Sequence, residues 1–187
     1  LQVLRMAAAG KRFIKGFSYS SHYVAEGFSR AEVASKLARI RAAIRPHGTE
    51  IANTVPTVLR AMPFIPLYPI LGQKGERWVP MHGIIAFSRV QAFRDGLMAL
   101  YEEYRERMET HKLAYGAMFL TVSTHAFLYE PVFYWEDSRT QFHKRYMPQD
   151  YLATLPEYPE NPDGRALVAE MRERIQGLFV EVGATHY

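Results

Sequence analysis

The chain has 187 residues and a mass of 21.6 kDa, and 48% of its residues are hydrophobic, which is enough for one substantial core. It contains no cysteine, which excludes disulfides, iron–sulfur clusters and thiolate chemistry and fits a reducing compartment such as the cytoplasm. Its 23 basic and 19 acidic residues are spread without a basic cluster, and no apolar run approaches the ~20 residues of a membrane helix, so neither nucleic-acid binding nor a membrane span is expected.

The first part of the chain predicts a short helix at 1–9, a strand at 18–26 and a helix at 29–45. The strand is predicted from its aromatic and β-branched residues. The helix at 29–45 carries a single apolar stripe and is expected to cover a sheet. Its stripe consists of Val33, Leu37, Ile40 and Ile44.

The tripeptide Phe-Ser-Arg occurs at 28–30 and again at 87–89, each time between a strand-like and a helix-like stretch. A glutamate or glutamine follows each serine three residues later, as in a capping box, where the serine and the longer side chain satisfy backbone N–H groups. The repeat therefore predicts two related strand–helix units, so the fold is expected to be partly duplicated.

Four prolines interrupt the chain between residues 53 and 75, and they exclude a regular element there apart from a single helical turn at 57–62. The same segment is rich in apolar side chains. We expect this proline loop to dock against a partner surface or a pocket.

A regular order of elements follows the proline loop. The irregular stretch at 146–161 precedes the last helix. The order strand, helix, strand, strand, helix, strand predicts an α+β fold with a ferredoxin-like antiparallel sheet and helices packed on one face. The predicted elements are a strand at 79–87, a helix at 90–108, strands at 113–122 and 126–135, a helix at 162–182 and a strand from 184.

Glu130 is the most unexpected residue of the strand at 126–135, because it shares a face with Leu128, Val132 and Tyr134. An unpaired carboxylate there costs several kcal/mol or takes up a proton. Either Glu130 is paired with a basic neighbour, or this face is the wall of a pocket. The adjacent Pro131 predicts an edge strand or a bulge.

Three histidines are candidates for chemistry. His82 lies on a strand, His125 in a tight turn between strands, and His186 near the end of the chain. A histidine can be a base, a ligand or an attachment point for flavin, and the alternative for each is a structural role. The spacings typical of a metal site are absent, so no metal is expected.

Four stretches of the chain carry a resemblance to a known family, and they span 76–85, 129–135, 155–162 and 183–187. Together they resemble the C-terminal cap domain of FAD-linked oxidases, the superfamily of vanillyl-alcohol oxidase, p-cresol methylhydroxylase and the FAD-linked D-lactate and glycolate dehydrogenases. The resemblance implies a ferredoxin-like cap that closes over the flavin ring, with FAD held mainly by a separate N-terminal domain. It also implies hydride transfer from a hydroxy acid, an alcohol or an alkylphenol, with electrons passed to oxygen, a cytochrome or a quinone.

In this hypothesis Glu130 and His82 are the catalytic residues, and His125 and His186 lie beside the cofactor. The resemblance places His125 close to the position where some members join a histidine or tyrosine of the cap covalently to the flavin. Arg60 and Tyr134 are expected to bind substrate, since a guanidinium group suits the carboxylate of a hydroxy acid. Phenol-oxidising members carry a Tyr-Arg pair before the Thr-His dipeptide, where this chain has Gly183-Ala184. A phenol substrate is therefore not favoured.

Residues 1–187 are expected to form a single cap domain within a longer flavoprotein, which is cytoplasmic, or periplasmic if the full-length protein has a signal peptide. A homodimer is compatible with this hypothesis. The alternative is a non-enzymatic ferredoxin-like binding or assembly module. RNA binding on the sheet is a weaker alternative, because the aromatic and glycine-rich motif of RNA-binding sheets is absent.

Overall fold

A computed structural model describes residues 18–51, 53, 57, 61, 64 and 70–186. By its internal contacts the chain divides into two units, Leu1–Ile65 and Pro66–Tyr187, and each is described by itself. The expected helix at 1–9 and most of the proline loop, including Arg60, lie outside the described residues.

The described part of the first unit contains one long helix, α2 (Arg30–Ile44). Its N-terminus confirms the first capping prediction, because the Ser29 hydroxyl accepts the Glu32 N–H at 3.2 Å and the Glu32 carboxylate accepts the Phe28 N–H at 2.9 Å. None of the residues of α2 is buried. The described residues of the first unit contain no strand, so within this unit α2 has no sheet to cover.

The predicted strand at 18–26 is also wrong. These residues form neither a helix nor a strand, and large side chains such as Tyr19 (73% exposed) and Val24 (59% exposed) face solvent. Strand composition favours an extended backbone, but a strand forms only when its N–H and C=O groups find a partner chain. Without this strand, the first of the two expected strand–helix units is reduced to its helix, so the partial duplication does not form.

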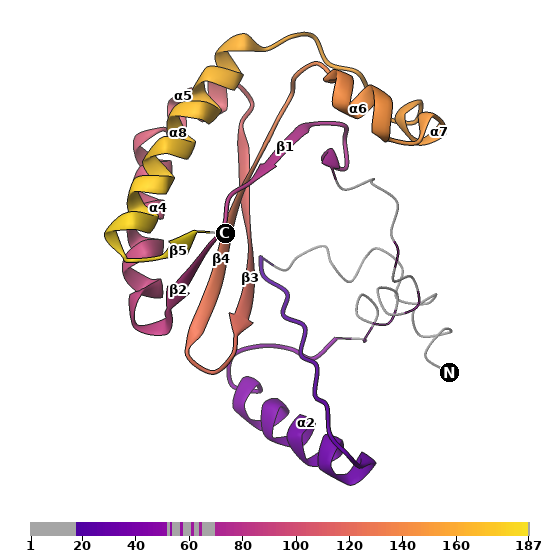
Figure 1. The fold of residues 1–187 in the computed structure, drawn as a ribbon, viewed down its shortest axis with the longest axis vertical. Helices are drawn as coiled ribbons and strands as arrows, with labels where there is room; N and C mark the ends of the chain where they lie inside the picture. The colour runs from indigo at the N-terminus through magenta and orange to yellow at the C-terminus, as the bar shows by residue number, and fades with distance from the viewer. Residues whose placement is uncertain are drawn as a thin grey trace. The chain divides into compact units, whose positions relative to one another are not determined.

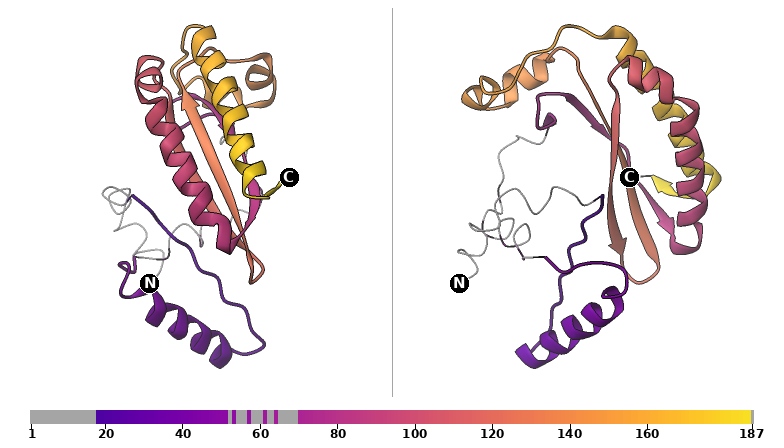
Figure 2. Two further views of the ribbon diagram at one scale, coloured as in Figure 1. Left: turned by 90° about the vertical axis from the view of Figure 1, so that its left-hand side faces the viewer. Right: turned by 180° about the vertical axis from the view of Figure 1, so that it is seen from behind.

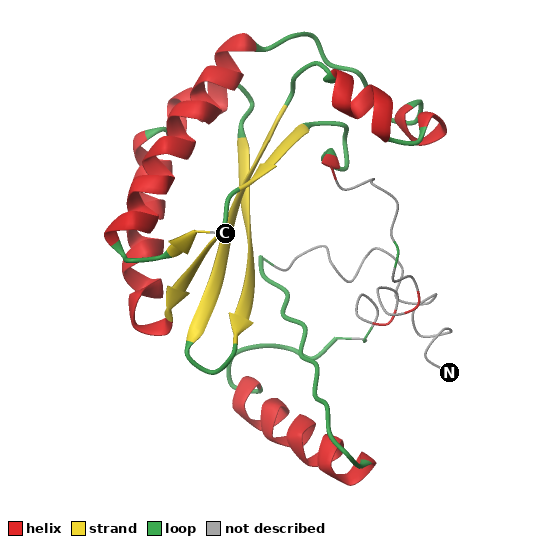
Figure 3. Cartoon of the chain, viewed as in Figure 1, coloured by secondary structure: helices red, strands yellow, loops and turns green. Residues whose placement is uncertain are grey.

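The second unit holds the sheet and the remaining helices (Figures 1 and 3). The expected strand at 79–87 is divided in two, and the expected helix at 90–108 is divided at Tyr104. The stretch expected to be irregular contains a short helix. The elements are β1 (Arg77–Pro80), β2 (Gly83–Ala86), η3 (Phe87–Arg89), α4 (Val90–Glu103), α5 (Arg105–Thr110), β3 (Ala114–Val122), β4 (Ala126–Trp135), α6 (Gln141–Tyr146), α7 (Gln149–Leu152), α8 (Pro162–Glu181) and β5 (Thr185–His186).

All pairings in this sheet are antiparallel, and β4 is its central strand. On one side β4 pairs with β3, and on the other it pairs first with β2 and then with β1. β1 and β2 run along β4 in the same register, from Arg77↔Trp135 to Ala86↔Ala126, so together they act as one interrupted strand. β5 pairs with the outer side of β2.

Pro131 explains the interruption, and its position corrects the expectation of an edge strand. It lies within the central strand β4, opposite the gap between β1 and β2. The Pro131 carbonyl accepts the Met81 N–H at 2.9 Å. Proline has no N–H, so it cannot donate the second hydrogen bond of this pair to Met81. The ladder is therefore incomplete at this point, which accounts for the break between β1 and β2.

The core lies between the sheet and the helices α4, α5 and α8, which lie together on one face of the sheet (Figure 2). In α4 and α8 apolar residues recur at the 3.6-residue spacing of a helix, and most of them are buried against the sheet. Residues with no exposed surface come from both strands and helices: Ile85, Phe93, Leu97, Phe133, Met171, Ile175 and Phe179.

The ends of the helices follow the sequence signals in one case and not in another. The Asn161 side chain caps α8 by accepting the Gly164 N–H at 2.8 Å, and Gly183 ends it with a φ of 67°, a conformation that favours glycine. The second capping box is absent, because Ser88 lies within η3 and the Gln91 amide donates to Asp95.

Candidate functional site

The face of the sheet opposite α4 and α8 carries Glu130, and we call it the Glu130 face. Side chains directly opposite each other on neighbouring strands lie on the same face. The registers therefore place His82, Glu130 and Met118 in one row across the sheet. The flanking rows are Pro80, Val132 and Gly116 on one side, and Ile84, Leu128 and Leu120 on the other.

Within the central row the His82 Nδ1 lies 3.9 Å from a carboxylate oxygen of Glu130. The Glu130 side chain is only 14% exposed and that of His82 is 31% exposed. Burial raises the pKa of the Glu130 carboxyl, and the attraction of His82 offsets only part of this effect. The structure therefore brings together the two residues expected to be catalytic, as a carboxyl that holds its proton more tightly than usual beside an imidazole.

We expect Glu130→Gln to increase the free energy of unfolding at neutral pH. Because the pKa of Glu130 is raised in the folded state, deprotonation costs more there than in the unfolded chain, and stability is lost as the pH rises through that pKa. Glutamine carries no such charge. Urea unfolding should therefore show the variant to be more stable at neutral pH, and the difference should disappear below pH 4.5, the ordinary value.

Glu109→Gln is the matched control, because this carboxylate is exposed on α5. It should change stability by less than about 0.5 kcal/mol. A loss of stability in Glu130→Gln at neutral pH would show instead that the carboxylate is held by favourable contacts.

Tyr134, predicted to bind substrate, lies on the same face as Glu130, and its pairing partners on the two neighbouring strands are Trp78 and Ala114. Burial raises the pKa of the Tyr134 phenol, and the carboxylate of Glu76 acts in the same direction. The side chain is thus a neutral, half-buried aromatic ring four residues from Glu130 on the same face of β4. In contrast, Tyr129, Phe133 and Trp135 are buried on the helix side of β4.

The other predicted site residues do not join this group. His125 is exposed in the turn between β3 and β4, where its carbonyl accepts the Phe87 N–H at 3.3 Å. It is five residues from Glu130, roughly 16 Å along the strand. His186 lies in β5, where its backbone pairs with Gly83 of β2. Arg60 lies outside the described residues.

A second cluster of charged residues, which the sequence did not indicate, is centred on Asp137, just after β4. Its side chain has no exposed surface, and it accepts hydrogen bonds from the backbone N–H groups of Ser138 (2.7 Å) and Asn161 (2.9 Å) and from the Trp135 indole (3.3 Å). Arg165 and Arg77 pair with it at 2.9 and 3.4 Å. The carboxylate is fully used within the fold, so we interpret it as a structural anchor.

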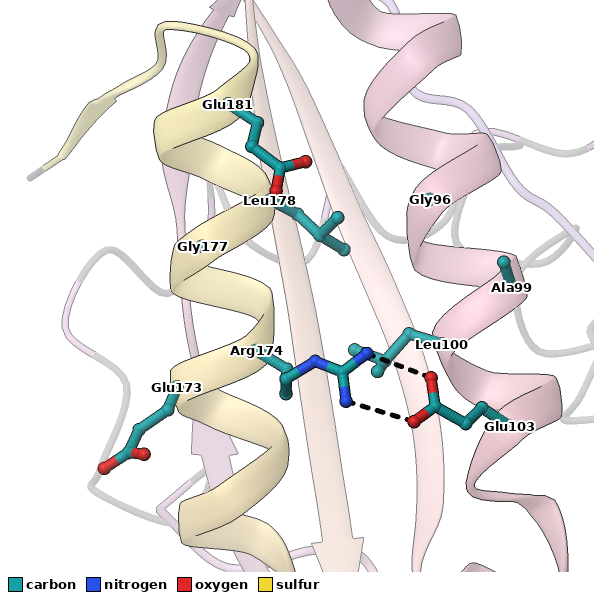
Figure 4. Close-up of a pocket in the computed structure, with 9 residues that line it drawn as sticks. All are labelled: Gly96, Ala99, Leu100, Glu103, Glu173, Arg174, Gly177, Leu178 and Glu181. Atoms are coloured by element: carbon teal, nitrogen blue, oxygen red, sulfur yellow. Dashed lines mark hydrogen bonds and ion pairs between the residues drawn. The ribbon is translucent and has the colours of Figure 1, made fainter.

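A hollow of about 340 Å³ lies between α4 and α8 (Figure 4). Small residues such as Gly96, Ala99 and Gly177 line it, and a double ion pair between Arg174 and Glu103, at 3.0 and 2.9 Å, spans it. It contains none of the predicted site residues, and its arginine is neutralised within the wall. The hollow is a gap in the packing of two helices, and the Glu130 face is the better candidate for a functional site.

Among the described residues, histidine, aspartate and glutamate form no group of three or more that could hold a metal ion. No helix in this part of the chain combines the length and apolar character that a membrane span requires. No protein-family model, curated protein or solved structure matches the chain.

Proposed function

We propose that the second unit is the substrate-binding cap of an FAD-dependent oxidoreductase that oxidises a hydroxy acid or an alcohol. The observation that carries the proposal is the contact between His82 and Glu130 on a sheet face that also presents Tyr134. Support also comes from the order β3, β4, β1/β2, β5 with helices on one face, which agrees with a ferredoxin-like cap.

The Glu130 face suits a planar ring system. Trp78 and Tyr134 lie opposite each other in neighbouring strands, and both rings are half-buried. Aromatic rings of this kind pack against flat apolar surfaces. Bound FAD would supply the acceptor for a hydride from the substrate carbon.

Glu130 would take the proton from the substrate hydroxyl. A general base works best when its pKa lies near the working pH, and burial raises the pKa of Glu130 in that direction. His82, 3.9 Å away, would orient the carboxylate and favour its charged form once the proton is lost. Tyr134 would contact the substrate beside this pair.

The test uses the polypeptide that contains this chain together with any flavin-binding region encoded beside it. We expect it to carry flavin and to lose flavin absorbance when mixed anaerobically with a series of 2-hydroxy acids and alcohols. Glu130→Gln should lower the rate of this reduction by about 10²- to 10⁴-fold, the usual contribution of a general base. Glu109→Gln should leave the rate unchanged, and a polypeptide that binds no flavin would rule the proposal out.

The second candidate is a binding or assembly module without catalytic activity. It is favoured by the exposure of apolar side chains on the Glu130 face, where Met118 is 47% and Leu120 is 52% exposed. In that case flavin would be absent and Glu130→Gln would act only on stability. The flavin measurement therefore separates the two candidates.

A further inference from the structure

β3 forms an edge of the sheet. Its nine residues pair with β4 along their whole length and with no other described strand. Most of its side chains are exposed, including those of Tyr115 (52%), Met118 (47%) and Leu120 (52%). An edge strand of this length presents a row of unpaired backbone groups to solvent.

The register shows which backbone groups these are. In an antiparallel ladder the N–H and C=O of one residue point to the same side, and the side alternates along the strand. The Pro131 carbonyl points away from β3, toward Met81, so Pro131 and its opposite residue Ala117 form a non-hydrogen-bonded pair. The N–H and C=O of Tyr115, Ala117, Phe119 and Thr121 therefore point outward from the sheet.

The sequence of β3 lacks the features by which edge strands avoid pairing. Proteins protect such edges with lysine, proline, inward-facing charges or bulges. The strand Ala-Tyr-Gly-Ala-Met-Phe-Leu-Thr-Val contains no charged residue and no proline, and its pairing with β4 is unbroken. No residue of β3 therefore prevents it from pairing with the β3 strand of a second copy of the chain.

We propose that two copies of this chain associate by antiparallel pairing of β3 with β3, around a two-fold axis at Met118. Two-fold association is the most common form of oligomer, and it requires a self-complementary surface. β3 meets this requirement because it is uncharged and can pair with an antiparallel copy of itself. All nine residues find a partner only when Met118, the middle residue, lies opposite Met118 of the other copy.

This register satisfies the outward backbone groups. Tyr115 faces Thr121 of the other copy and Ala117 faces Phe119, so each outward residue meets another outward residue and exchanges two hydrogen bonds with it. The side chains also fit, because a large ring lies opposite a smaller side chain in both pairs. These rings are held in place on the helix side by Tyr101, which contacts Tyr115 in a tilted arrangement, and by Tyr129, which contacts Phe119 edge-on.

The first test uses the absence of cysteine from the chain. In the proposed dimer a Met118→Cys variant places two thiols directly opposite each other, and oxidation should link most of the protein covalently. In the control Leu120→Cys, the two thiols are four residues apart along the strands, roughly 13 Å, which is too far for a disulfide. Equal cross-linking of the two variants would overturn the register.

The second test measures mass in solution by sedimentation. We expect the unmodified chain to approach twice 21.6 kDa and to fall toward 21.6 kDa on dilution. Ala117→Pro removes an outward N–H from both copies without touching the ladder to β4, so the dissociation constant should rise about tenfold or more. Ala117→Val keeps the N–H and should leave the dissociation constant within about threefold of the unmodified value.

A chain that stays at 21.6 kDa at every concentration would overturn the proposal and would point to another occupant of the edge, such as an extended peptide. Circular dichroism shows whether Ala117→Pro has folded. If it has not, the cross-linking of Met118→Cys still decides the outcome, because that substitution is at an exposed position.

Discussion

Asp137→Ala is expected to lower the free energy of unfolding by about 3–5 kcal/mol, a large part of the total for a domain of this size. The substitution removes a carboxylate with no exposed surface, takes the ion-pair partner from Arg77 and leaves the Trp135 indole N–H without its acceptor. It also frees the N–H of Asn161, the N-cap residue of α8. Both tryptophans, Trp78 and Trp135, lie in this unit, so tryptophan fluorescence during urea unfolding measures the change.

Asp95→Ala is the control, because Asp95 is 62% exposed and its ion pair with Arg94 lies on the surface. It should change stability by less than about 0.5 kcal/mol. An equal loss in the two variants would show that Asp137 is not an anchor.

The effect of Asp137 should also depend on pH. Burial by itself would raise the pKa of this carboxyl, but the hydrogen bonds from Asn161, Ser138 and Trp135 and the charge of Arg165 outweigh it and lower the pKa. Stability from this group is therefore present above pH 3.8, the ordinary value, and is lost as the pH falls through the lowered pKa. Asp137→Asn should lack this acid-dependent loss, so the two proteins should converge in stability at low pH.

Phe179→Ala is expected to cost about 3–5 kcal/mol, the usual result of removing a buried ring. The Phe179 ring has no exposed surface and stacks on Phe93, with ring centres 4.2 Å apart. The neighbouring Val180 is 69% exposed, so Val180→Ala on the same helix should have little effect. Thermal unfolding of the two variants would show the contrast directly, and equal melting temperatures would contradict the core position of Phe179.

The ring of Phe179 also explains why a glycine occupies position 83. A Cβ atom at Gly83 would lie 2.8 Å from the Phe179 ring, so Gly83→Ala should destabilise by about 1–3 kcal/mol through overpacking. Phe179→Leu should reduce this cost, and a double-mutant cycle would measure the coupling. Gly177→Ala is the opposite control, because a Cβ there meets nothing within 4 Å and alanine favours the helix.

The arrangement of the Glu130 face depended on pairing that the sequence only partly indicates. The alternation of residues along β4 placed Glu130 and Tyr134 on one face, and that prediction is confirmed by the register. The contact between Glu130 and His82 required the register of β1 and β2 against β4, between residues about fifty positions apart. Pro131 was interpreted as an edge residue, although its missing N–H faces a gap in the neighbouring strand.

The sequence by itself determined the features that depend on residues within a few positions of each other. These are the apolar faces of α4 and α8, the start of α8 at Asn161 and its end at Gly183, and the adjacent strands β3 and β4. Helix spacing, capping and tight turns are local, so neighbouring residues suffice to specify them. The same local signals predicted a strand at 18–26, which failed because strand composition does not supply a pairing partner.

Only the tertiary structure decided which distant groups meet. Asp137 receives its partners from Arg77 on one side of the sequence and from Asn161 and Arg165 on the other, and no local pattern marks it. The division of one strand into β1 and β2 likewise followed from Pro131, a residue on another strand. Hydrogen bonds and ion pairs between distant segments depend on how the chain packs, because a buried polar group is stable only where the fold supplies its partners.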